Sequence, residues 1–117
     1  MATTKVKQNV TPGLREYFGK NTPSSQYDTF EFEFESEMTI HDIAIEMSST
    51  SDSWNLNLIY PTSGITANIA SSQSGDWMLN SYSTEKQWFR IPAKTILQWE
   101  ANAASPTETV TLVVIGQ

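Results

Sequence analysis

The sequence predicts an all-β protein: an antiparallel two-sheet β-sandwich, jelly-roll-like, with about eight short strands. Phenylalanines at 30, 32 and 34 alternate with glutamates at 31, 33 and 35, which is the period of a strand with one buried face. Further short apolar runs, separated by loops rich in Ser, Asn, Pro and Gly, continue to the end of the chain. Only residues 12–18 have a helix-like pattern, so strands account for the rest of the predicted fold.

The strand that begins near residue 28 also predicts an irregularity. Met38 and Ile40 continue the even-numbered apolar positions, whereas Ile43 and Ile45 are odd. We therefore expect strands over about 28–35 and 38–48, with one extra residue absorbed near His41 and Asp42.

Six more strands are expected after residue 50. They cover residues 54–60, 65–69, 77–79, 87–91, 95–100 and 109–115. The last run, TVTLVVI, is dense in β-branched residues, which favours a central position in its sheet. An immunoglobulin-like sandwich is the alternative topology, although the Cys…Trp…Cys cue is missing.

Length and composition bound the class of protein. A chain of 117 residues is expected to form one sandwich domain with its own core, and the absence of cysteine excludes disulfides and thiolate sites. The N-terminus lacks an apolar signal segment and the longest apolar run, 112–115, is too short to span a bilayer. We expect a soluble protein, made in the cytosol, without a membrane partner.

Residues 1–27 lack strand alternation and are predicted to form an extended N-terminal arm before a sandwich domain at 28–117, with a helical turn within 12–18. A frayed terminus is the alternative. The first twenty residues carry a net charge of +3 and the rest of the chain −9. An acidic body disfavours nucleic acid, so the arm is expected to bind protein. The arm residues predicted to contact a partner are Lys5, Lys7, Leu14, Arg15, Tyr17 and Phe18.

The three glutamates Glu31, Glu33 and Glu35, here called the acidic strip, have two interpretations. They are either a solvated face that prevents edge-to-edge aggregation, or a docking strip for the basic arm of another copy. The pattern alone leaves both open.

Residues able to carry catalysis are few. His41 is the only histidine, and although Asp42 follows it, no nucleophile motif accompanies the pair. Asp52 and Asp76 lie in Ser-rich loops, but no calcium-loop motif surrounds them. The alternating glutamates could supply a glycosidase pair, yet binary patterning explains them as well. We expect no enzyme activity, no metal and no cofactor.

Four tryptophans are many for this length. Trp54 shares parity with Leu56 and Leu58, so it is expected in the core. Trp77, Tyr82 and Trp88 are the candidates for an exposed aromatic surface. Such a surface stacks on sugars or forms a subunit interface, and the sequence does not separate the two uses.

The C-terminal quarter carries the pattern I-P-x-x-T-x-L-x-W at 91–99, then a small-residue loop at 101–106 and a final strand at 110–115. With a short polar N-terminal segment and a Ser/Thr/Asn-rich body, it resembles small structural proteins of tailed bacteriophages. These include capsid decoration (cement) proteins and tail or adaptor proteins. The resemblance implies a virion component, commonly trimeric, attached to a larger shell by its arm and sandwich faces.

The sequence therefore predicts a non-enzymatic decoration protein whose partners are other copies of itself and a capsid. A carbohydrate-binding module that uses exposed Trp and Tyr is the alternative, and a small glycan-active enzyme ranks last.

Overall fold

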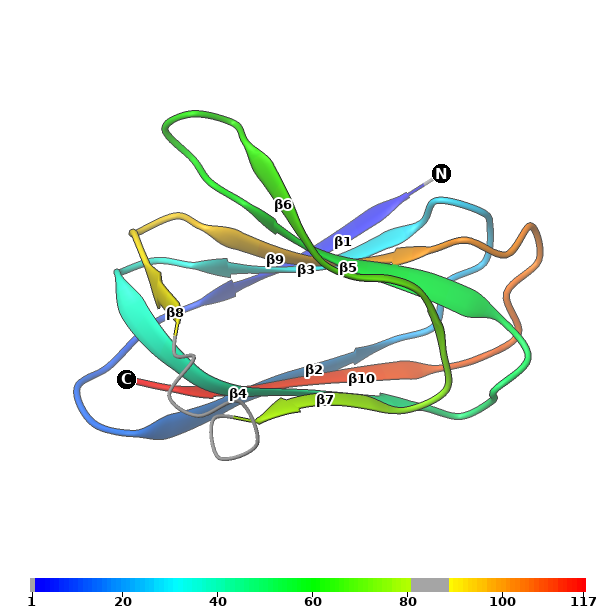
Figure 1. Ribbon diagram of the computed structural model, residues 1–117, viewed down its shortest axis with the longest axis horizontal. Coiled ribbons are helices and arrows are strands. Elements are labelled where there is room, and N and C mark those ends of the chain that lie inside the picture. The colour runs from blue at the N-terminus through cyan, green and yellow to red at the C-terminus, as the bar shows by residue number, and fades with distance from the viewer. Residues whose placement is uncertain (1, 81–88) are drawn as a thin grey trace.

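The computed structural model describes residues 2–80 and 89–117. In these residues it contains ten strands and no helix, and the strands form two sheets that pack face to face (Figure 1). The strands are β1 (Thr3–Gln8), β2 (Arg15–Asn21), β3 (Thr29–Phe34), β4 (Met38–Met47), β5 (Ser53–Ile59), β6 (Thr66–Ser74), β7 (Trp77–Asn80), β8 (Phe89–Ile91), β9 (Ile96–Ala101) and β10 (Val110–Gly116). The predicted β-sandwich is confirmed.

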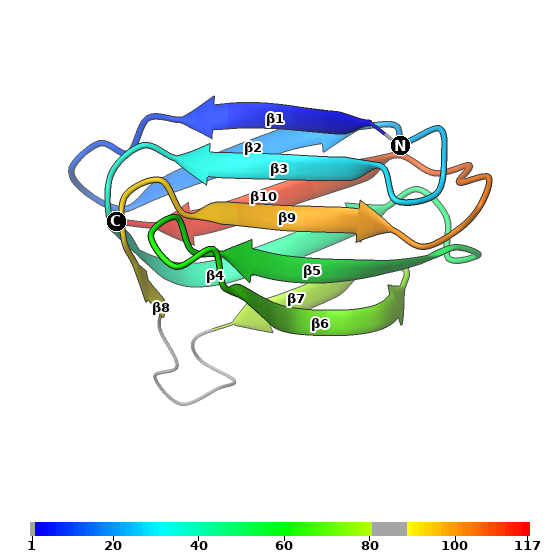
Figure 2. The same cartoon turned by 90° about the horizontal axis from the view of Figure 1, so that it is seen from above.

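Sheet A has the strand order β1-β3-β9-β5-β6, and sheet B the order β2-β10-β4-β7, with β8 also paired to β4. Figure 2 shows sheet A lying over sheet B along its whole length. The late strands β9 and β10 each insert between two earlier strands. The expectation that the TVTLVVI run is central is therefore correct, because β10 pairs with both β2 and β4.

The first 27 residues differ from the expected arm. Residues 3–8 form β1, which pairs in parallel with β3, and residues 15–21 form β2, which pairs antiparallel with β10. The predicted helical turn within 12–18 is wrong, because β2 begins at Arg15 and Tyr17 is buried in the core. Both strands lie at sheet edges, where polar side chains are tolerated and alternation is weak.

One buried aspartate fixes the start of β1. The Asp28 carboxylate accepts hydrogen bonds from the backbone nitrogens of Ala2 (2.6 Å), Ser24 (2.9 Å) and Ser25 (3.0 Å). The hydrogen bonds from Ser24, Ser25 and Ala2 hold the pKa of Asp28 far below its usual range. This carboxylate joins the turn before β3 to the N-terminal strand.

The core is made by the ring face of β3 and the inward faces of its neighbours. Phe30, Phe32 and Phe34 are completely buried, and successive rings meet edge to face at centroid distances of 5.6 and 6.2 Å. Trp54 and Trp99 are equally buried. The predicted ring face is therefore the wall of the core.

The predicted irregularity in β4 is a β-bulge. Ile115 of β10 opposes Asp42, whereas the next residue, Gly116, opposes Ile40. His41 is the additional residue, and it changes the parity of the buried positions on either side of it.

Candidate functional site

The residues predicted to form the arm's contacts separate into buried and exposed groups. Tyr17 packs edge to face on Phe34, with ring centroids 5.9 Å apart. Leu14 and Phe18 are 58% and 61% exposed. Lys7 and Arg15 are also exposed, so the predicted contact residues do not share one surface.

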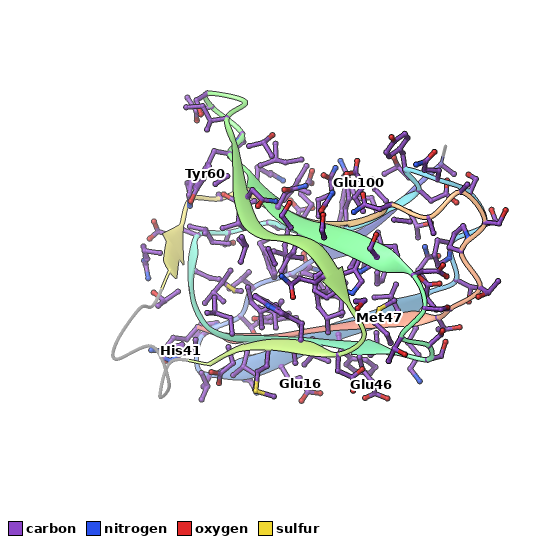
Figure 3. The ribbon with its side chains drawn as sticks, turned by 45° about the vertical axis from the view of Figure 1, so that its right-hand side comes forward. Glu16, His41, Glu46, Met47, Tyr60 and Glu100 are labelled. Atoms are coloured by element: carbon purple, nitrogen blue, oxygen red, sulfur yellow. The ribbon has the colours of Figure 1, made fainter. Side chains whose placement is uncertain are left out.

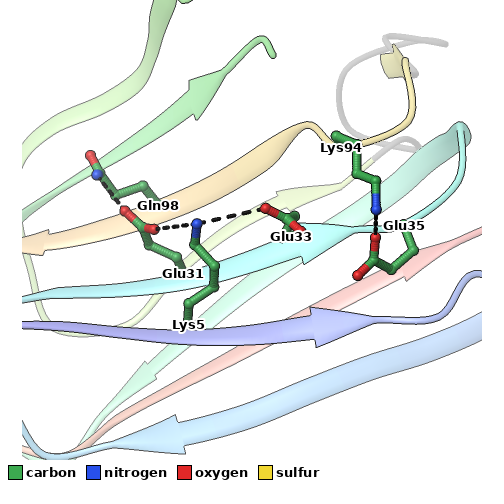
Figure 4. A network of polar contacts seen from close by, with 6 residues as sticks. All are labelled: Lys5, Glu31, Glu33, Glu35, Lys94 and Gln98. Carbon is green, nitrogen blue, oxygen red and sulfur yellow. Dashed lines mark hydrogen bonds and ion pairs between the residues drawn. The ribbon is translucent and has the colours of Figure 1, made fainter.

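The acidic strip is paired within the chain, as Figure 4 shows. The Lys5 ammonium lies 3.9 Å from Glu31 and 3.6 Å from Glu33. Glu35 pairs with Lys94, which lowers the pKa of the Glu35 carboxyl. Lys5 of the expected arm thus contacts the acidic strip of its own chain through the β1–β3 pairing.

A polar row crosses the outer face of sheet A. Glu31 accepts from Gln98 (2.7 Å), Gln98 accepts from Asn57 (3.1 Å), and Asn57 accepts from Asn68 (2.9 Å). These residues oppose one another in register on β3, β9, β5 and β6. The row satisfies its own side chains and therefore serves first to hold sheet A together.

The predicted aromatic surface is not supported at Trp77. Its ring packs edge to face on the buried Trp54, at a centroid distance of 6.1 Å, and it contacts the hydrophobic core. Tyr82 and Trp88 lie outside the described residues. Trp77 is therefore a core-edge residue and not an open stacking platform.

A pair of carboxyl groups joins two loops at one end of the sandwich. Asp52, in the loop between β4 and β5, and Glu108, just before β10, both accept a hydrogen bond from the Thr107 nitrogen, at 3.1 and 3.0 Å. Burial, together with the hydrogen bond with Asp52, raises the pKa of Glu108 to about 7. The same contact lowers the pKa of Asp52. Sequence reasoning singled out Asp52 but missed its partner.

Within residues 2–80 and 89–117, no three acidic or histidine side chains lie close enough together to hold a metal ion. No helix of the described segments is long and apolar enough to cross a membrane.

An apolar row, exposed at its two ends and half-buried at Ala44 and Val113, crosses the outer face of sheet B. The residues Phe18, Val113, Ala44 and Met78 oppose one another in register on β2, β10, β4 and β7. Phe18 and Met78, at the two ends, are 61% and 64% exposed. This set is here called the apolar row, and it is continuous across strands that are distant in sequence.

Charged residues flank the apolar row. Glu16 and Asp42 lie on one side, opposite Ile115, and Lys20 and Glu46 lie on the other, opposite Thr111. Figure 3 shows Glu16 and Glu46 projecting from sheet B, on the side of the molecule opposite Tyr60 and Glu100. An apolar centre with a charged rim is the usual anatomy of a protein interface.

A shallow groove of about 330 Å³ lies at the β4–β7 end of the apolar row. It is lined by Ala44, Ile45, Glu46, Asp76, Trp77, Met78 and Val113. Asp76 is held at its edge by a hydrogen bond from the Met47 nitrogen to Oδ1, at 2.8 Å. The groove therefore combines an apolar floor with two carboxylates.

The fold and this face define the chain as a β-sandwich domain with one polar and one amphipathic outer surface. It matches no protein-family model and no curated protein. Among solved structures it is similar to the pre-peptidase C-terminal domain of collagenase from Bacillus anthracis, with a TM-score of 0.50 and 12% identity over 95% of this chain and 93% of that one. A mutant of PliG-Ec, a periplasmic inhibitor of g-type lysozyme from Escherichia coli, gives a TM-score of 0.46 and 12% identity over 98% and 99% of the two chains. The first likeness shows the β-sandwich fold and carries nothing about function.

Proposed function

We propose that this chain is a non-enzymatic structural protein that docks on a larger protein assembly through the outer face of sheet B. The observation that carries the proposal is the apolar row, whose end residues Phe18 and Met78 are mostly exposed. Contiguous exposed apolar surface with a charged rim is typical of an interaction face. Phe18 keeps the anchoring role expected of the N-terminal segment, and it lies on the edge strand β2 of sheet B.

The specific form favoured by the sequence resemblance is a capsid decoration protein of a tailed bacteriophage, which assembles as a homo-oligomer, commonly a trimer, on the virion. A tail or adaptor protein is the closest alternative form. Both act by burying surface across subunit joints, without catalysis.

The test is co-sedimentation with phage heads purified without this protein. Wild type is expected to bind to saturation, and the variant Phe18→Ser/Met78→Ser to lose binding while its circular dichroism spectrum is unchanged. Ile65→Ser, at an exposed apolar residue in the loop between β5 and β6, is the matched control and should bind like wild type. Failure of the wild-type protein to bind any head preparation, or equal binding by the double variant, would contradict the proposal.

A second candidate function is carbohydrate binding on sheet A. It is favoured by the amide groups of Asn57, Asn68 and Gln98, which lie in one row on an outer sheet face. Amides bind sugar hydroxyls, but here they already bind one another, which ranks this function second. Titration with a glycan panel tests it: perturbed side-chain amide resonances of these residues support it, and no saturable change refutes it.

A further inference from the structure

We infer that the groove beside the apolar row binds a basic side chain, arginine in the first place, of the docking partner. The inference rests on the proposed function and names the chemistry of the partner. It starts from a place on the sheet B face where apolar and acidic groups line a common concavity.

The shape of the groove follows from the cross-strand register. Ala44 lies between Val113 and Met78 in the apolar row, so a small side chain is flanked by two larger ones. The resulting depression has a volume at the low end for ligand sites, which suits one long side chain.

The charge of the groove selects the kind of side chain. Glu46 and Asp76 are both exposed and line it, and neither forms an ion pair with any of residues 2–80 or 89–117. The hydrogen bond from the Met47 nitrogen fixes the orientation of the Asp76 carboxylate. An arginine stem can lie along Ala44 and Met78 while its planar guanidinium donates to the two carboxylates.

The same charges argue against a second copy of this face as the occupant. Glu16 and Glu46 border the apolar row and Asp76 lines the groove, whereas Lys20 is the basic residue in register beside them within the described segments. Two such faces brought together would carry excess negative charge, which disfavours their association. A partner with a basic rim around an apolar centre complements this surface instead.

The test is an NMR titration of the full chain with two short peptides, one with arginine between two leucines and the other with the neutral isostere citrulline. We expect the arginine peptide to shift the amides of residues 44–46 and 76–78 to saturation. The citrulline peptide should bind about fivefold more weakly. Glu46→Gln should weaken arginine binding by a similar factor. Glu37→Gln, which changes an exposed glutamate elsewhere, is the matched control and should have no effect.

Equal binding of the two peptides, or shifts outside the groove only, overturns the inference. The two proposals fail separately. If phage heads bind through Phe18 and Met78 but the arginine peptide does not bind, the groove assignment is wrong and the docking function stands. If the arginine peptide binds the groove but no head binds the protein, the capsid assignment is wrong and the groove stands.

Discussion

The buried carboxyl pair makes stability depend on pH in a direction opposite to that of most surface acids. Glu108 is 1% exposed and its pKa is raised from 4.5 to about 7. Between these two values the folded state therefore binds a proton that the unfolded state has lost. The free energy of unfolding should fall as pH rises from about 4.5 to about 7 and then level off, as far as this group is concerned.

The full shift of the Glu108 pKa corresponds to about 3 kcal/mol of unfolding free energy. We expect about 1–2 kcal/mol, because the loops that carry Asp52 and Glu108 lie at one end of the sandwich, where water screens part of the cost. Glu108→Gln keeps the shape, can accept from the Thr107 nitrogen and can donate to Asp52. Its free energy of unfolding should therefore match that of wild type near pH 5 and exceed it by about 1–2 kcal/mol near pH 8.

Urea unfolding followed by tryptophan fluorescence, at several pH values across this range, measures the difference. In the companion variant Asp52→Asn, the fall of the unfolding free energy with pH should occur at lower pH than in wild type but should not disappear. The reason is that burial is the larger cause of the raised Glu108 pKa. Parallel pH profiles for wild type and Glu108→Gln would refute the reasoning.

Three further variants test the architecture by their urea midpoints. Gly116→Ala should cost about 2–3 kcal/mol, because an added Cβ would lie 2.6 Å from the Thr39 carbonyl oxygen at the bulge; an unchanged midpoint would show that β10 can shift. Phe32→Ala should cost about 3–5 kcal/mol, since its ring is completely buried between two others, and a loss below about 1 kcal/mol would contradict that packing. Asn57→Ala should cost about 1–2 kcal/mol, because it interrupts the polar row, removes the donor to the Gln98 carbonyl oxygen and removes one acceptor of the Asn68 amide; stability equal to wild type would mean that water replaces the lost bonds.

The two outer faces of the sandwich have different physical characters. On sheet A, polar side chains bind one another across four strands, so little hydrogen-bonding capacity remains unused. On sheet B, side chains of the same cross-strand geometry are apolar in the middle row and charged on either side. A partner gains more by covering sheet B, because exposed Phe18 and Met78 lose contact with water while few internal bonds are broken.

The sequence was sufficient to predict features that depend on a single strand. The alternation in residues 29–35 places the phenylalanine rings on the buried side, since successive side chains of a strand point to opposite faces. The parity change between Ile40 and Ile43 likewise predicts the bulge at His41. Both signals lie within a few residues, where the backbone geometry is the same in any sheet.

The sequence was misleading where strands lie at edges. β1 and β2 expose most of their side chains, so their alternation is weak and the sequence pattern predicts an arm in their place. Their place in the fold is fixed by backbone pairing with β3 and β10, and by the hydrogen bond that the Asp28 carboxylate accepts from the Ala2 nitrogen. A sequence pattern within one strand does not predict which distant strand it pairs with.

Burial of β3, the bulge in β4 and the central place of β10 were determined by the sequence itself. The tertiary structure alone decided that Lys5 pairs with the acidic strip of its own chain, and that residues 18, 44, 78 and 113 form one row beside a groove. The reason is physical: side-chain period reports which side of a strand faces the core. The neighbour of that strand is chosen by hydrogen bonding between segments far apart in the chain, and its register then decides which side chains share a surface.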